Sequence, residues 1–139
     1  MSELSEFDHD FGVSSPAGGW VAIVPAPPSA NDMTSFGKGR VYRSKAYKAW
    51  LGRCFFLTRG AITKVEGTVS IDIAIVGGKG LKANRDLDNF VKPIVDMCRH
   101  LGVIPEDNFS IVRALRATYT PPANKTARAR VTVMVFPDP

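Results

Sequence analysis

The 139-residue chain has no long apolar run, and this absence limits where the protein is expected to reside. No apolar stretch approaches the roughly 20 residues that a membrane-spanning helix requires. The first residues include Glu3 and Glu6, whereas a secretory signal begins with positive charge. We therefore expect a cytoplasmic protein with no membrane partner.

Cysteine and histidine are also scarce, with two of each. Cys54 and Cys98 lie in apolar patterns of helical spacing with no Cys or His at ligand spacing, so both are expected in the core. His9 lies in the acidic N-terminal segment, His100 ends a predicted helix, and no serine lies in a nucleophile-elbow sequence. These shortages argue against a disulfide, a zinc site and covalent nucleophilic catalysis. No small-molecule cofactor is expected.

Acidic residues are the third shortage, because 18 Lys and Arg face 13 Asp and Glu and leave a net charge of +5. Four of the acids lie within the first ten residues, so residues 18 to 139 carry 18 − 9 = +9. A basic surface attracts polyanions whatever their sequence, which favours a nucleic-acid partner. A soluble basic domain without such a partner is the alternative.

Length and composition fit one folded domain behind a tail. An apolar content of 45% is enough for one packed core in a chain of this length. Residues 1–17 are polar and acidic, and Pro16, Gly18 and Gly19 close that segment. We therefore expect a disordered tail at 1–17 and one domain at 18–139.

Hydrophobic periodicity predicts four strands and two helices. Ser44 caps a helix that reaches Thr58, and a second helix spans 89–101 and stops at Gly102. The predicted strands are 20–24, 68–76, 110–119 and 127–136. The order strand, helix, strand, helix, strand, strand predicts an α+β fold. It would have a single mixed or antiparallel sheet of about four strands, the last two forming an antiparallel hairpin, and both helices on one face.

Two loops rich in glycine and basic residues separate these elements. The segment 31–43 follows a proline-rich stretch and is expected to be a flexible loop near phosphate. Glycines in the segment 77–84 allow the backbone to approach a ligand closely. Solvated loops without a ligand remain the alternative for both. The predicted phosphate-binding residues are Lys38, Arg40, Arg43, Lys79, Lys82 and Arg85.

The rest of the chain is organised around the stretch Arg85-Asp86-Leu87-Asp88-Asn89-Phe90-Val91-Lys92. In an extended segment Asp86 and Asp88 leave the same face, and Leu87 points into the core. Asp88 is also a good N-cap residue, so the second helix is expected to begin at the acidic pair.

The start of that helix favours anions, because helix N-termini carry partial positive charge and free N–H groups. Lys92 lies one turn inside, four residues after Asp88, and can reach the carboxylates or a bound phosphate. Pro93 cannot donate to the carbonyl of Asn89 and predicts a distorted first turn.

Asp86 and Asp88 predict a Mg²⁺ site, for which Mn²⁺ can substitute, and the later Glu106-Asp107 pair offers Asp107 as a third ligand. Mg²⁺ prefers oxygen ligands and is held by one or two carboxylates plus substrate phosphate. A metal-activated water would then hydrolyse a phosphate ester, with Lys92 binding the phosphate or the leaving group.

Other interpretations of the acidic pair remain open. Asp-x-Asp occurs in turns and helix caps, and Lys92 or Arg85 can neutralise the carboxylates without a metal. Some glycosyltransferases use Asp-x-Asp with Mn²⁺ and nucleotide sugars, but such enzymes generally need a larger nucleotide-binding domain than 139 residues allow.

The order of motifs resembles the RusA family of Holliday-junction endonucleases, usually encoded by bacterial prophages and phages. The resemblance covers about residues 20 to 136, and its core is Asp-Leu-Asp-Asn-x-x-Lys with an acidic pair downstream. The matching residues are Pro27-Pro28-Ser29-x-Asn31, a basic Gly-rich loop, Arg85 to Asn89, Lys92, Asp96, Gly102 and Glu106-Asp107.

The resemblance implies a homodimeric, Mg²⁺-dependent endonuclease that resolves four-way DNA junctions by paired symmetric nicks in recombination and repair. It implies catalytic, metal-binding aspartates at Asp86, Asp88 and Asp107 and an essential Lys92, which joins the basic residues above as a DNA contact. Two departures are the N-terminal tail and Glu106, where the family usually has Asp. A non-catalytic DNA- or RNA-binding module is the rival hypothesis.

The position of Asp107 raises a separate question. A helix from Asn89 to Leu101 is about 20 Å long at 1.5 Å per residue, so it carries the chain away from Asp88 before Asp107 appears. Residues 102–106 span at most about 18 Å when fully extended. A partner subunit's Asp107 completing the site is therefore one hypothesis, and a tilted first turn at Pro93 is the other.

Overall fold

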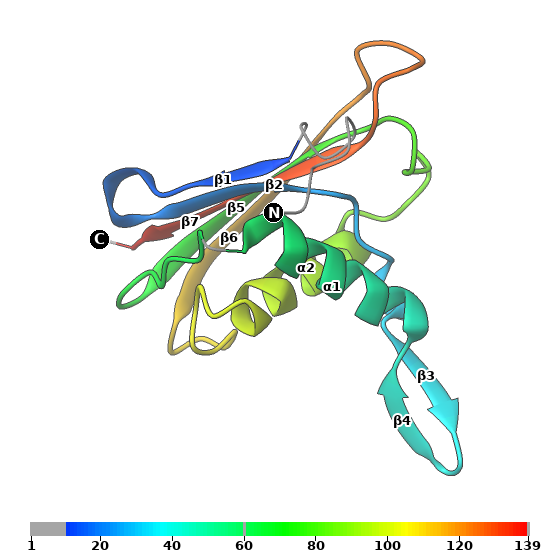
Figure 1. Cartoon of the computed structure of the whole chain (residues 1–139), viewed down its shortest axis with the longest axis horizontal. Coiled ribbons are helices and arrows are strands. Elements are labelled where there is room, and N and C mark those ends of the chain that lie inside the picture. Colours follow the sequence, from blue (N-terminus) through cyan, green and yellow to red (C-terminus); the bar gives the residue numbers. More distant parts are fainter. Residues whose placement is uncertain (1–10, 60, 139) are drawn as a thin grey trace.

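The computed structural model describes residues 11–59 and 61–138 and has an α+β fold (Figure 1). Its main sheet has the strand order β1-β2-β7-β5-β6, and β3 and β4 form a separate two-stranded sheet. The strands are β1 (Gly12–Ser14), β2 (Trp20–Val24), β3 (Thr34–Gly37), β4 (Arg40–Arg43), β5 (Val69–Val76), β6 (Val112–Thr120) and β7 (Arg130–Pro137). The helices are α1 (Lys45–Thr58) and α2 (Asp88–His100), with 3-10 turns η2 (Pro16–Gly18) and η3 (Ala30–Asp32).

One face of the main sheet carries the core. Burial alternates strictly along β5, and β2 and β7 follow the same pattern. The buried strand residues form one cluster with Trp50 and Cys54 of α1 and with Phe90 and Ile94 of α2. Because side chains of a strand alternate between faces, both helices must cover the same face, which confirms that part of the predicted fold.

The helix boundaries follow from their caps. The Ser44 side chain accepts a hydrogen bond from the Tyr47 amide at 3.1 Å and begins α1, as predicted. Gly102 has φ +83°, a left-handed conformation that ends α2 at low cost. Asp88 is the first residue of α2 rather than its cap, and its Oδ1 accepts from the Asn89 amide at 3.0 Å. Among the described residues, no helix is both long enough and apolar enough to cross a membrane.

The strand order differs from the prediction that the last two strands form a hairpin. β6 pairs in parallel with β5, whereas β7 pairs antiparallel with both β5 and β2. α2 connects β5 to β6, and a helical crossover returns the chain so that the next strand runs parallel to the first. The chain then crosses to the other side of β5, where β7 fills the position beside β2.

Three short strands were not predicted. β1 pairs with β2 at one edge of the sheet, so residues 12–14 of the expected tail belong to the domain. Residues 1–10 of that tail lie outside the described residues. β3 and β4 form a hairpin within the segment 31–43, which was expected to be a flexible loop, and Figure 1 shows this hairpin projecting from the body.

Candidate active site

The acidic pair lies where the chain leaves the loop after β5 and enters α2. Asp86 and Asp88 are both exposed, and so is Lys92 one turn inside the helix. Leu87 has helical dihedral angles and is 44% exposed, so the prediction of an extended segment with Leu87 in the core is wrong. The exposed carboxylates therefore belong to the start of a helix, with Asp88 and Lys92 four residues apart on one side of it.

Arg85 anchors the loop that carries this pair. Its Nη1 donates to the carbonyl of Pro27 at 2.7 Å, and its guanidinium lies 4.7 Å from the ring centroid of Phe90. Burial lowers the pKa of Arg85, and its Nε and Nη2 are buried without a hydrogen-bond partner. The side chain predicted to bind phosphate thus points inward and fixes the loop to the segment before η3.

A cavity of about 210 Å³ lies beside Asp86. Apolar side chains make up most of its wall, among them Leu81, Leu87 and Phe90, and Arg85 contributes the buried guanidinium. The cavity is not a metal site, because hard cations need several oxygen ligands and only Asp86 offers a carboxylate here. The cavity borders Asp86, and Ile75 and Tyr119 of the main sheet form another part of its wall.

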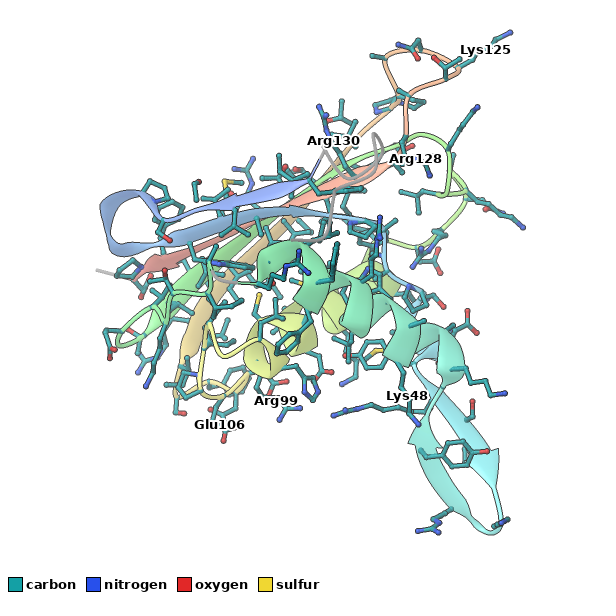
Figure 2. All side chains as sticks on the ribbon, in the orientation of Figure 1. Lys48, Arg99, Glu106, Lys125, Arg128 and Arg130 are labelled. Carbon is teal, nitrogen blue, oxygen red and sulfur yellow. The ribbon has the colours of Figure 1, made fainter. Side chains whose placement is uncertain are left out.

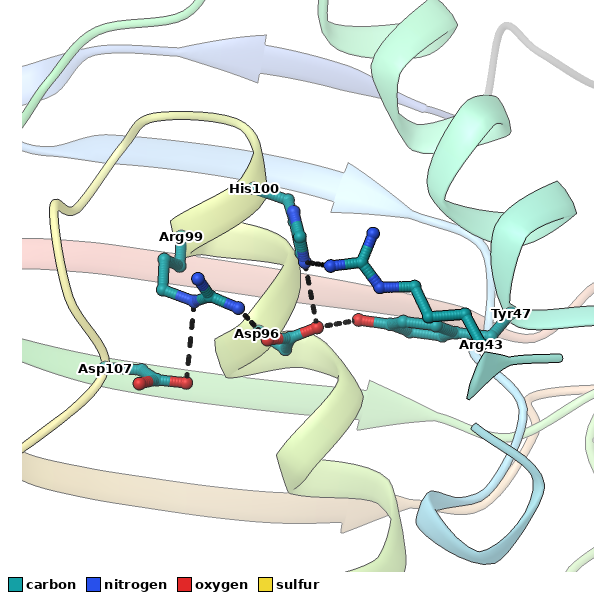
Figure 3. A network of polar contacts seen from close by, with 6 residues as sticks. All are labelled: Arg43, Tyr47, Asp96, Arg99, His100 and Asp107. Atoms are coloured by element: carbon teal, nitrogen blue, oxygen red, sulfur yellow. Dashed lines mark hydrogen bonds and ion pairs between the residues drawn. The ribbon is translucent and has the colours of Figure 1, made fainter. Parts of the chain in front are cut away.

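The polar side of α2 continues into a network that Figure 3 shows from close by. Asp96 accepts hydrogen bonds from the Tyr47 hydroxyl and, at 2.9 Å, from Arg99. Burial disfavours the charge on Asp96, but these two bonds together with the charges of His100 and Arg99 outweigh it and leave the pKa of Asp96 below the usual value. Burial and the bond to Asp96 raise the pKa of Tyr47, so its hydroxyl remains the donor.

His100 joins the same network through Arg43. An Arg43 Nη2 lies 2.7 Å from His100 Nε2. Because a guanidinium only donates, Nε2 must accept, and His100 is neutral in this arrangement. Burial and the nearby guanidinium groups lower the pKa of His100 against the opposing effect of Asp96. Nε2 is also 3.3 Å from Asp96, but this is an ion pair only for a protonated ring.

Asp107 lies at the other end of α2 from the acidic pair. Its Oδ2 is 3.8 Å from Nε of Arg99, and Figure 2 shows Glu106 near Arg99 at this end of the helix. Thirteen helical residues separate the two ends by about 20 Å. The pairing of β5 with β6 also places Asp107 and Asp86 at opposite ends of the sheet. Asp107 precedes β6, which begins beside Val69 at the start of β5, whereas Asp86 follows the end of β5.

The three predicted metal ligands are therefore not brought together within one subunit. In the part of the chain that the structure describes, no group of three or more His, Cys, Asp or Glu could hold a metal ion. Asp86 and Asp88 stand as a pair, and Asp107 is paired with Arg99 instead.

The predicted phosphate-binding residues form two separate groups. Lys38, Arg40 and Arg43 belong to the β3–β4 hairpin, and Lys48 of α1, which the prediction did not single out, lies near the base of that hairpin (Figure 2). Lys79 exchanges backbone hydrogen bonds of 2.9 Å with Ala127 and Ala129, so the glycine-rich loop is tied to the segment before β7. Exposed Lys82 follows in the same loop.

Comparison with known proteins adds no assignment. A scan against models of protein families finds no match, and a search of curated proteins finds none either. The family suggested by the motifs therefore stays a prediction.

Proposed function

We propose that this chain is a RusA-type, Mg²⁺-dependent endonuclease that cuts four-way DNA junctions by paired symmetric nicks. The observation that carries the proposal is the exposed pair Asp86 and Asp88 at the start of α2, with Lys92 one turn later. The contact of Asp88 with the Asn89 amide is a local one at the start of α2, and no hydrogen bond or ion pair among the described residues involves the Asp86 side chain. In a basic protein both carboxylates would repel the phosphates that the rest of the surface attracts. A bound cation resolves this conflict.

The acidic pair suits Mg²⁺ with Mn²⁺ as a substitute. Two carboxylates together with substrate phosphate are a common ligand set for Mg²⁺, which keeps the remaining positions for water. Asp86 and Asp88 would hold the metal, and Asp107 would complete the ligands from a second subunit. In its bound state the cation supplies an acidified water and neutralises charge on the phosphate.

The chain's own residues position the substrate. Hydrolysis requires water to attack phosphorus while one P–O ester bond breaks and its electrons pass to the leaving oxygen. Lys92 is exposed on the same side of α2 as Asp88 and can neutralise a phosphate oxygen or the leaving oxygen. The partial positive charge at the N-terminus of α2 lies at the same place and favours the anionic phosphate.

A two-fold dimer is part of the proposal. A four-way junction has approximate two-fold symmetry and must be cut in two strands of like polarity, which a C2 dimer matches. Asp86 and Asp107 lie at opposite ends of α2, so a partner subunit's Asp107 can join the pair only across a subunit interface.

The test is nicking of a synthetic four-way junction by the wild type and by Asp86→Asn, with and without Mg²⁺. Loss of a metal ligand removes several kcal/mol of charge stabilisation, so we expect a decrease in nicking rate of about 10² to 10⁴. Binding should be unchanged or tighter, because a charge that repels phosphate is gone. Asp72→Asn removes a carboxylate from β5, outside the site, and should nick normally.

The same experiment separates the enzyme from the rival hypothesis, a non-catalytic module that binds DNA or RNA. The basic β3–β4 hairpin fits either function, since phosphate contacts do not require chemistry. If the wild type binds the junction but Mg²⁺ produces no nicks, or if Asp86→Asn nicks at the wild-type rate, the endonuclease assignment is wrong.

A further inference from the structure

The β3–β4 hairpin stands away from the core, and the proposed active site gives no account of it (Figure 1). Its tip is the two-residue turn Lys38-Gly39, where φ is +51° and +75°. Positive φ at both positions is the geometry of a type I′ turn, which matches the twist of paired strands. The hairpin is thus a defined arm with a tight tip.

The two faces of this arm differ. Phe36 pairs with Val41, and the two side chains share one face, where they are 82% and 54% exposed. On the other face Tyr42 lies across Gly37, since a Cβ at Gly37 would be 2.6 Å from the Tyr42 hydroxyl oxygen. The ring of Phe36 is therefore almost fully in water at the end of the arm, where it adds nothing to the core.

The charge around the arm has one sign. From residue 33 to residue 65 the sequence has eight Lys and Arg and no Asp or Glu. A hollow of about 460 Å³ opens on the arm toward α1, and Lys38, Arg40 and Lys48 line it together with Val41 and Tyr42. A basic hollow with an aromatic wall has the chemistry of a site for a nucleic-acid strand.

The base of the arm is fixed to the helix of the proposed active site. Arg43, the last residue of β4, contacts His100 of α2 at 2.7 Å. Tyr47, in the first turn of α1, donates to Asp96 of α2. These contacts hold the arm at a set orientation to α2, which carries Asp88 and Lys92 at its other end.

We propose that the β3–β4 arm recognises the branch point of DNA. A phosphodiester strand lies in the basic hollow, and the Phe36 ring, which does not line the hollow, stacks on the base pair left open where two arms of the DNA separate. This inference rests on the proposed function for its substrate, branched DNA. An intact duplex offers no free base face, so stacking by Phe36 favours branched over linear DNA.

A second copy of this chain is the other candidate to cover Phe36, and charge argues against it. If the arms of two copies packed together, their Lys and Arg side chains would repel one another, because neither arm has a carboxylate. DNA phosphates would instead neutralise these cations.

The experiment measures binding in EDTA, so that no cleavage occurs. The substrates are a four-way junction and a linear duplex of the same sequence. In the junction 2-aminopurine replaces a base next to the branch, and in the duplex it occupies the same sequence position. For Phe36→Ala we expect junction binding to weaken by about 5- to 100-fold on the scale of base–aromatic stacking, with duplex binding unchanged. The wild type should quench 2-aminopurine fluorescence in the junction, and Phe36→Ala should not.

Three further variants separate stacking from simple apolar contact. Phe36→Trp should keep the quenching, whereas Phe36→Leu, which is apolar but not aromatic, should lose it. Phe55→Ala removes an aromatic side chain that is 55% exposed on α1 and should behave as the wild type. Because Phe36 is exposed, its truncation removes little buried area and leaves the fold intact.

Two results overturn the proposal. One is Phe36→Ala binding and quenching as the wild type does. The other is a loss of dimer mass in Phe36→Ala with unchanged quenching, which assigns the ring to a second copy. The proposed function can fail on its own. If the wild type binds the junction and quenches 2-aminopurine but Mg²⁺ produces no nicks, the endonuclease proposal is wrong and the proposed role of the arm is not affected. If the wild type does not bind the junction, both the proposed function and the proposed role of the arm are wrong.

Discussion

At the scale of single residues, Asp96 joins α1 to α2, and its neighbour His100 contacts Arg43 of the arm. The Asp96 side chain is 15% exposed and accepts hydrogen bonds from Tyr47 and Arg99. Buried charges are tolerated only when they are paired and hydrogen-bonded, so these contacts explain why a carboxylate can occupy this position. Asp96 was matched to the family motif without a role, and the structure gives it a structural one.

The network predicts two losses of stability in acid. The folded pKa of His100 lies below 6.5, so its stabilising neutral form is fully present above pH 6.5 and is lost as pH falls through the folded value. The folded pKa of Asp96 lies below 3.8, so its contribution is present above pH 3.8 and is lost at still lower pH.

Chemical denaturation at a series of pH values checks this prediction. The free energy of unfolding of the wild type should fall below pH 6.5 with a slope from His100 of at most about 1.4 kcal/mol per pH unit. His100→Asn should remove the first loss and Asp96→Asn the second. If the free energy of unfolding depends on pH in the same way in the wild type and in His100→Asn between pH 5 and 7, His100 is not neutral in the folded protein.

Residue-level expectations held where the signal is local. Ser44 and Gly102 delimit their helices as predicted, and Cys54 and Cys98 are buried free thiols. Leu87 and Arg85 behaved differently because a loop has no period that fixes which way a side chain points. The position of Arg85 depends on a carbonyl 58 residues away, at Pro27, and no neighbouring residue encodes that contact.

At the scale of elements, the β3–β4 arm and α1 offer a matched pair of glycine substitutions. Gly39 has φ +75° in the turn, whereas Gly52 lies within α1, where an added methyl group would meet no atom within 4 Å. Gly39→Ala should destabilise the arm by about 1 to 2 kcal/mol, the cost of a left-handed conformation for an L-residue. Gly52→Ala should stabilise the protein by about 0.5 to 1 kcal/mol.

Amide hydrogen exchange and thermal unfolding measure the two effects separately. Gly39→Ala should lower protection within residues 34–43 and leave the main sheet unchanged, because the arm is a separate sheet. Gly52→Ala should raise the melting temperature. If Gly39→Ala unfolds the whole domain, the arm is part of the cooperative core and not an independent arm.

The elements themselves were largely predictable, and their arrangement was not. The short apolar run over 20–24 and the alternation over 68–76 predict β2 and β5, and each of these strands has one buried face. Periodicity does not say which strands are neighbours, so the predicted hairpin of the last two strands is replaced by a parallel β5–β6 pair. The arm was missed because strands of four residues with exposed side chains carry little hydrophobic pattern.

At the scale of the whole molecule, charge and topology act together. In the proposed function the basic surface attracts DNA over a wide area, and the arm and the acidic pair are local features attached to the same helix, α2. The β5–α2–β6 unit separates Asp86 and Asp88 from Asp107 by the length of that helix. We therefore propose that an active site takes Asp86 and Asp88 from one subunit and Asp107 from its partner.

A mixture of Asp86→Asn and Asp107→Asn proteins, allowed to exchange subunits, tests this claim most directly. With shared sites, the heterodimer has one site in which Asp86, Asp88 and Asp107 are all intact, and its partner site lacks both Asp86 and Asp107. The account predicts that each variant alone is inactive on the four-way junction in Mg²⁺ and that the mixture regains nicking of single strands, at no more than about a quarter of the wild-type rate per subunit if subunits mix at random. Absence of any recovered nicking in a mixture whose heterodimers are verified by native mass spectrometry would contradict it.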